Sequence, residues 1–172
     1  INKRSLQTAR TVKKFNDDGN RPVRYATAIG RFQFTADPAD IELEARMIWE
    51  RYSATDFGGP QYEYYLDGKP LLVVYAGNCD PGLWEGDKTY AERFTLRWAN
   101  NDSTPGYYGW AYDKGSQWDD EVVVVMPGWN NMKGATPVPR NAGRWYEASW
   151  DVVLREKKAP RIILINSFNE YA

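Results

Sequence analysis

The chain has 172 residues, with 22 basic and 23 acidic side chains, no histidine and a net charge of −1. This near-neutral balance gives no electrostatic reason to expect nucleic acid as a partner, and no apolar run reaches the roughly 18 residues of a membrane span. The absence of histidine excludes Ser-His and Cys-His nucleophile pairs and argues against zinc, so we expect no metal and no cofactor. The single cysteine, Cys79, excludes a disulfide within the chain.

The first fifty residues predict a helix, a strand and a second helix. Residues 5–15 have apolar side chains at helical spacing, and residues 22–30 read as a strand that ends at a glycine. The second helix has a clear start, because Asp37 can cap it and Pro38 suits its first position. Its buried face is predicted to consist of Ile41, Ala45, Ile48 and Tyr52.

The middle of the chain predicts short elements separated by turns. Residues 57–70 are rich in turn formers and lead into an apolar strand over 71–78. A short helix is expected over 88–94, followed by a strand over 95–101. Residues 106–113 are expected to be extended.

The last third predicts a strand, a helix and a strand. Residues 121–131 contain four consecutive valines after Glu121, and the final strand contains four aliphatic residues at 162–165. The helix between them is expected over 142–158. Its inward side is predicted to hold Trp145, Ser149, Val152 and Val153.

The strands are continuous apolar runs, not alternating ones. This pattern is typical of strands buried on both faces, as in parallel sheets covered by helices. Because helices separate several of the strands, the sequence predicts an α/β fold in one domain over residues 1–172. Functional side chains in such folds gather at the carboxyl ends of the strands.

Amides, aromatic rings and carboxylates recur at these carboxyl ends. By contrast, Lys69, Glu121 and Arg161 at the amino ends read as solvated strand starts. We therefore predict a site at the carboxyl ends. Its candidate residues are Asn78, Asn100, Tyr112, Asp113, Trp129, Asn130, Asn166, Asn169 and Glu170.

This set of residue types suits a carbohydrate, because amides and carboxylates bind hydroxyls and an aromatic ring packs on the apolar face of a sugar. Hydrolysis of a glycosidic bond commonly needs two carboxyl groups. Glu170 is the first candidate and Asp113 the second, although Glu170 could equally be a solvated residue in a loop.

The binding residues also have structural alternatives. Trp129 could support a sugar ring or close the end of the fold, and Tyr112 could donate a hydrogen bond or be buried for packing. Asn166 and Asn169 could orient substrate hydroxyls or stabilise their own loop. Asn78, Asn100 and Asn130 are assigned to the site by their place after the strands alone.

Three segments of the sequence resemble the glycoside hydrolase family 99-like enzymes, the group related to endo-α-mannosidases. They are YYLDGKPLLVVYAG from residue 64, VVVVMPGWNN from residue 122 and ILINSFNEYA from residue 163. The resemblance implies a (β/α)8 barrel, here an incomplete one without its first strands and last helix. It also implies a retaining hydrolase that acts on an oligo- or polysaccharide.

The family pattern after the last barrel strand is Asn-Glu-Trp-x-Glu, and residues 169–172 match its first four places with tyrosine for tryptophan. By this match Glu170 would assist the 2-hydroxyl of the sugar as an internal nucleophile. The second glutamate would follow Ala172, so we expect the chain to be part of a larger protein whose remainder is a partner. By analogy we expect export, to the periplasm or outside the cell. The alternatives are a non-catalytic carbohydrate-binding or surface-assembly protein on the same scaffold, and a plain structural domain.

Overall fold

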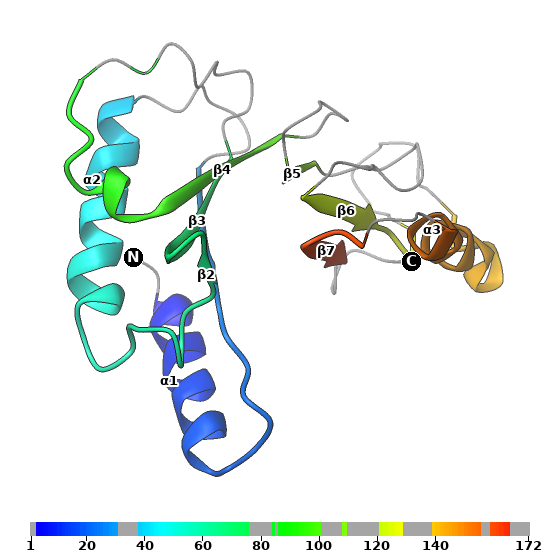
Figure 1. Cartoon of the computed structure of the whole chain (residues 1–172), viewed down its shortest axis with the longest axis horizontal. Helices are drawn as coiled ribbons and strands as arrows, with labels where there is room; N and C mark the ends of the chain where they lie inside the picture. Colours follow the sequence, from blue (N-terminus) through cyan, green and yellow to red (C-terminus); the bar gives the residue numbers. More distant parts are fainter. Residues whose placement is uncertain are drawn as a thin grey trace. The chain divides into compact units, whose positions relative to one another are not determined.

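The structure is a computed structural model that describes residues 3–30, 38–75, 84, 86–100, 108–109, 121–128, 139–155 and 159–165. The chain divides into two compact units, Ile1–Trp98 and Ala99–Ala172. Figure 1 gives the order of the elements along the chain. Each unit is described by itself.

The first unit is built on a strongly buried strand, β3 (Lys69–Tyr75). Its neighbours are β1 (Thr27–Gly30), which runs parallel to it, and β4 (Thr95–Asn100). The pairing of β1 with β3 is in register from Thr27 opposite Leu72 to Gly30 opposite Tyr75. Because β3 is buried on both faces, the prediction from its apolar run is confirmed.

A two-residue turn joins β3 to the short antiparallel strand β2 (Tyr65–Leu66). Asp67 and Gly68 both have positive φ, 54° and 83°, as a type I′ hairpin turn requires. The predicted turn is confirmed, and β3 begins at Lys69 and not at residue 71 because Lys69 and Pro70 pair with β2.

Two helices pack in the first unit, α1 (Lys3–Asp17) and α2 (Pro38–Ile48). A short π-helix, η1 (Trp49–Ser53), extends α2, with the Ala54 N–H donating to the Trp49 carbonyl at 2.8 Å. The predicted inward face of this helix is confirmed, because Ile41, Ala45, Ile48 and Tyr52 are all buried. They form one core cluster with Leu72 and Val74 of β3.

Two predicted elements of this unit are shorter than expected. The strand predicted over 22–30 begins only at Thr27, because the segment before it makes a single bridge, between Tyr25 and Glu63. The helix predicted over 88–94 is a 3₁₀ turn, η3 (Ala91–Arg93). Its start is held by Glu42 of α2, whose carboxylate accepts the N–H groups of Tyr90 at 2.7 Å and Ala91 at 2.9 Å.

The second unit contains two parallel strand pairs. The short strand β5 (Tyr108–Gly109) pairs with Ala99 and Asn100 at the end of β4. The other pair is β6 (Val122–Val125) and β7 (Ile162–Ile165), in register throughout. The helical segment between them comprises η4 (Asn141–Gly143) and α3 (Arg144–Arg155).

Helix α3 packs on β6, and most of its predicted inward face is confirmed. Ser149 and Val153 are buried, and Trp145 is half-buried with its Nε1 shielded from solvent. The prediction for Val152 is wrong, since its side chain is 39% exposed. The aromatic residues Tyr146 and Trp150 pack against the cluster of Val123, Val125 and Val153, with ring centroids 6.1 Å apart.

Strand β7 does not have the burial that its sequence predicts. Ile163 and Ile165 are 39% and 55% exposed, and the four residues alternate between half-buried and exposed. In β6, all four valines are buried. The expectation of burial on both faces is therefore right for β6 and wrong for β7, because an apolar run of four residues does not distinguish one covered face from two.

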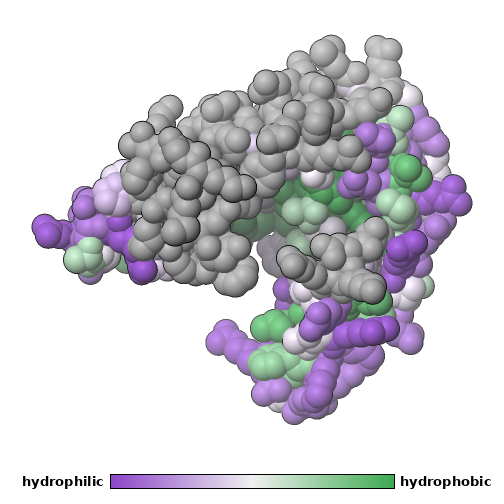
Figure 2. Space-filling view, turned by 180° about the vertical axis from the view of Figure 1, so that it is seen from behind, coloured by the Kyte–Doolittle hydropathy of each residue, from purple (hydrophilic) through white to green (hydrophobic). Residues whose placement is uncertain are grey.

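The fold is a mixed α/β fold with small open sheets, and the described residues contain no closed barrel. None of the described helices has the length and apolar character needed to cross a membrane. On the face in Figure 2 most of the visible described residues are hydrophilic, with apolar side chains in a few small groups among them. Some apolar surface of this kind is normal for a folded domain.

Gly30 at the end of β1 is expected to be essential for the close approach of β1 to β3. Its φ is +120°, and a Cβ there would lie 2.2 Å from the Tyr75 carbonyl oxygen. We predict that Gly30→Ala lowers the free energy of unfolding by about 3 kcal/mol, because backbone strain and a clash add. Urea unfolding measures this change.

Gly19 provides the matched control, since its φ is +79° but nothing lies within 4 Å of its added Cβ. Gly19→Ala should cost only the backbone strain of about 1–2 kcal/mol. Equal losses in the two variants would contradict the close approach at Gly30.

Candidate functional site

The carboxyl ends of the paired strands lie together, as the sequence predicts for parallel pairs. Gly30 at the end of β1 is opposite Tyr75, and Val125 at the end of β6 is opposite Ile165. The chain segments that follow β6 and β7 therefore start from the same edge of their two-stranded sheet. Those segments carry Trp129 and Glu170 in the sequence.

The predicted site residues themselves lie largely outside the described residues. Only Asn100 is within them, as the last residue of β4, where its backbone pairs with Gly109. The others lie outside the described ranges. They are Asn78, Tyr112, Asp113, Trp129, Asn130, Asn166, Asn169 and Glu170.

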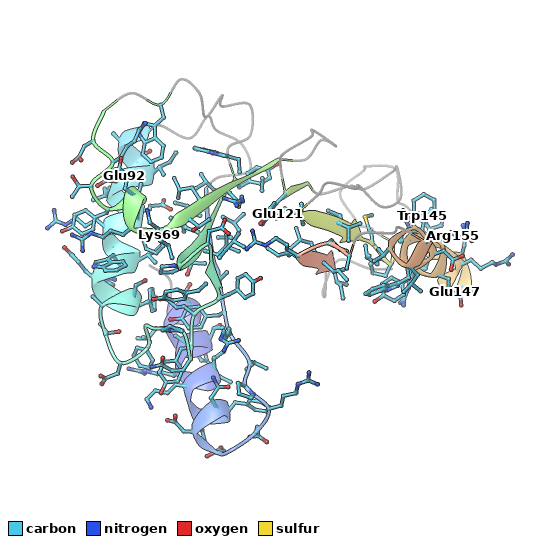
Figure 3. The ribbon with its side chains drawn as sticks, viewed as in Figure 1. Lys69, Glu92, Glu121, Trp145, Glu147 and Arg155 are labelled. Carbon is cyan, nitrogen blue, oxygen red and sulfur yellow. The ribbon has the colours of Figure 1, made fainter. Side chains whose placement is uncertain are left out.

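At the amino ends of the strands, Lys69 and Arg161 are exposed as predicted, whereas Glu121 is not. Lys69 is exposed, and its Nζ donates to the Glu92 carbonyl oxygen at 2.6 Å (Figure 3). The Glu121 side chain is only 19% exposed, so the prediction of a solvated strand start is wrong for this residue. Its carboxylate accepts a 2.6 Å hydrogen bond from the buried Tyr108 hydroxyl and lies 3.6 Å from the Arg161 guanidinium.

The first unit contains a buried carboxyl group that sequence analysis missed. Glu63 is 2% exposed, and its Oε1 accepts a hydrogen bond from the Ser53 hydroxyl at 2.8 Å. Its Oε2 is also buried and has no hydrogen-bond partner. A buried carboxyl oxygen without a partner is energetically costly, especially when the group is charged.

Burial raises the pKa of Glu63, and hydrogen bonds from Ser53 and the Gly59 backbone offset only part of that shift. Burial also raises the pKa of Tyr25 and of Tyr65, and in both cases the Glu63 charge adds to the effect. The Tyr25 hydroxyl donates to the Phe57 carbonyl oxygen at 2.6 Å. Burial therefore disfavours the charged form of each of these side chains.

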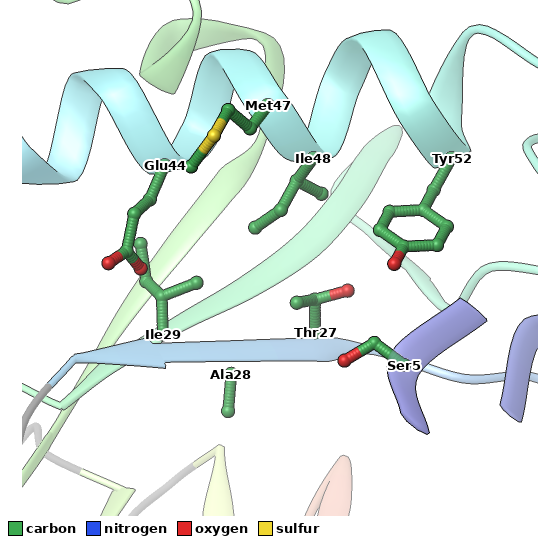
Figure 4. A pocket seen from close by; sticks show the side chains of 8 residues that line it. All are labelled: Ser5, Thr27, Ala28, Ile29, Glu44, Met47, Ile48 and Tyr52. Carbon is green, nitrogen blue, oxygen red and sulfur yellow. The ribbon is translucent and has the colours of Figure 1, made fainter. Parts of the chain in front are cut away.

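A pocket of about 190 Å³ lies in the same unit, beneath α2 and η1. Figure 4 shows Thr27 and Ile29 of β1 pointing toward this helix, with Tyr52 of η1 and Ser5 of α1 at one end. Tyr52 is 3% exposed, and its neighbour Ser53 is the residue that binds Glu63. The π-helix thus presents one side chain to the pocket and the next to the buried carboxyl group.

The described residues contain no group of three or more acidic, histidine or cysteine side chains placed to hold a metal ion. Comparisons with protein families, with curated proteins and with solved structures find no match to this chain.

Glu63 is predicted to make stability depend on pH. The pKa of Glu63 is raised in the folded state, so the folded protein keeps the carboxyl proton at a pH where the unfolded chain has lost it. The contribution of Glu63 to the free energy of unfolding therefore falls as pH rises above about 4.5. We predict that Glu63→Gln, which resembles the protonated acid, stabilises the protein at pH 7. The gain is about 1.4 kcal/mol for each pH unit that separates the folded and unfolded pKa values.

Urea unfolding of both proteins between pH 4 and pH 8 tests this prediction. The difference between them should be small at pH 4 and should grow with pH. Glu92→Gln, the same change at an exposed position, is the control. A difference for Glu63→Gln that does not depend on pH would contradict the assignment.

Proposed function

We propose that the protein binds an oligo- or polysaccharide and hydrolyses its glycosidic bonds at the carboxyl edge of β6 and β7. The observation that carries the proposal is the register of this pair, in which Val125 is opposite Ile165. Three residues separate Val125 from Trp129 and four separate Ile165 from Glu170, so both side chains belong to segments that leave one edge of the sheet.

The residue types after these strands support a carbohydrate as the ligand. Trp129 offers a flat apolar surface for a sugar ring, and Asn130, Asn166 and Asn169 offer amide donors and acceptors for its hydroxyls. Asn100 ends β4, and Asn78 and Tyr112 come after other strands in the sequence; they are proposed as further sugar-binding residues by residue type and position alone.

Glu170 and Asp113 are the proposed catalytic carboxyl groups. In an ordinary retaining enzyme two such groups are about 5 Å apart, and in an inverting one about 6.5–9.5 Å. The resemblance to the family 99-like enzymes supports retention, with Glu170 assisting the 2-hydroxyl of the sugar. That route uses the substrate's own oxygen as nucleophile, so it does not require the 5 Å separation.

The scaffold proposed for this chemistry is an incomplete (β/α)8 barrel. Three parallel pairs support it, β1 with β3, β4 with β5, and β6 with β7. The crossover from β6 to β7 contains α3, as a barrel unit requires. Export from the cell is proposed by analogy with other polysaccharide-active proteins.

Glu170→Gln is expected to reduce glycan hydrolysis by about 10²–10⁴-fold, the range that a positioned proton-transfer group contributes. Unfolding stability should remain near that of the unaltered protein. Glu147→Gln, at an exposed position of α3, is the control and should keep full activity. Hydrolysis that survives Glu170→Gln would reject the assignment, whereas glycan binding without any hydrolysis would favour a non-catalytic binding protein.

Trp129→Ala is expected to weaken glycan binding by about tenfold, since packing on an aromatic ring contributes about 0.5–1.5 kcal/mol beyond the buried area. Titration calorimetry with a panel of oligosaccharides measures the change. An affinity that stays the same while unfolding stability falls would show that Trp129 serves packing alone.

A further inference from the structure

We propose that the pocket beneath α2 and η1 binds a small organic cation, an alkylammonium group, independently of the carbohydrate site. The pocket volume of about 190 Å³ corresponds to about six water molecules at roughly 30 Å³ each. It is smaller than the roughly 300–1,000 Å³ of sites for drug-sized ligands. A ligand with only a few heavy atoms would therefore fit.

The polar groups of the pocket come from four different elements. Ser5 belongs to α1, Thr27 to β1, Glu44 to α2 and Tyr52 to η1. In Figure 4 the Thr27 and Tyr52 side chains point into the space between β1 and the helix, and Glu44 lies at the other end of the same space. Side chains that converge from separate elements are what a binding pocket requires.

The charge of the lining decides the class of ligand. Glu44 is the one charged residue among the eight that line the pocket, and no basic side chain lines it. Within the described part of the chain no ion pair involves Glu44. An anionic ligand would be repelled, whereas a cation would gain a charge-assisted hydrogen bond.

The remaining groups favour a donor with an apolar body. An ammonium group has three donors and no acceptor, so it suits the Glu44 carboxylate at one end of the pocket. The hydroxyl groups of Ser5 and Tyr52 lie at the opposite end. Ile29, Met47 and Ile48 form the apolar wall, against which an alkyl chain would pack. A neutral alcohol of the same size would gain the apolar contact but not the charge of Glu44.

Tyr52 has a fixed position at the end of the pocket opposite Glu44. Its side chain is buried, and burial raises its pKa, although the Arg51 charge and a hydrogen bond with Ser5 act in the other direction. It therefore remains a neutral hydroxyl at physiological pH. The backbone that carries it is fixed by the π-helical hydrogen bond from Ala54 to Trp49, and such local widening of a helix is common at functional sites.

Binding can be tested with n-butylammonium, n-butanol and n-butyrate on the full chain, followed by NMR of backbone amides and methyl groups. We expect saturable shifts at Ile29, Met47 and Ile48 with n-butylammonium. The alcohol should bind at least tenfold more weakly, and the carboxylate should not bind. No saturable response to n-butylammonium, or an equal response to the alcohol, would overturn the proposal.

Two variants locate the contact. Glu44→Gln keeps the size of the side chain and should weaken n-butylammonium binding at least tenfold, whereas Asp56→Asn removes a charge from an exposed position outside the pocket and should leave binding unchanged. Unchanged affinity in Glu44→Gln, or equal loss in both variants, would overturn the proposal. The comparison of the three ligands on the unaltered protein needs no variant, so it decides the question even if a substitution disturbs folding.

Discussion

The packing of α2 and η1 against the sheet determines the rest of the first unit. Ile41, Ala45, Ile48 and Tyr52 repeat every three or four residues, so they form one stripe along the helix. This stripe lies against Leu72 and Val74, and burying each large aliphatic side chain contributes about 1.5–3 kcal/mol. With this stripe packed, the Glu42 carboxylate can accept the N–H of Tyr90 at the start of η3, and the Ser53 hydroxyl can donate to Glu63.

The two units place polar groups differently. In the second unit the proposed carbohydrate site depends on residues that follow the parallel strands β6 and β7. In the first unit Tyr52 and Glu63 are buried, and a charge at such a position is costly. The two sites proposed for this protein therefore differ in position, one at a strand edge and one beneath a helix.

The sequence predicts the elements that are strongly periodic or that need special backbone geometry. The inward face of α2 and the Asp67-Gly68 turn are examples, because one depends on spacing and the other on the preference of these residues for positive φ. Burial of short apolar strands is harder to predict. The strands β6 and β7 are both runs of four aliphatic residues, yet Ile163 and Ile165 of β7 are exposed.

The buried polar residues could not be predicted, since they depend on contacts between distant parts of the chain. Glu63 lies among tyrosines in a segment whose sequence predicts a polar turn, and its bridge with Tyr25 and its bond to Ser53 join residues far apart in the chain. The aromatic neighbours Tyr62, Tyr64 and Tyr65 were the one available signal. The proposed carbohydrate site rests on residue order and on the resemblance to the family 99-like enzymes, because most of its residues lie outside the described ranges.

The hairpin of β2 and β3 bears on how the first unit assembles. Only Asp67 and Gly68 separate the two strands, so closing this loop loses far less chain entropy than bringing Thr27 to Leu72. Because contacts between residues close in sequence form fastest, we expect the β2–β3 turn to form before β1 pairs with β3. In that order β3 would offer the edge onto which β1 adds.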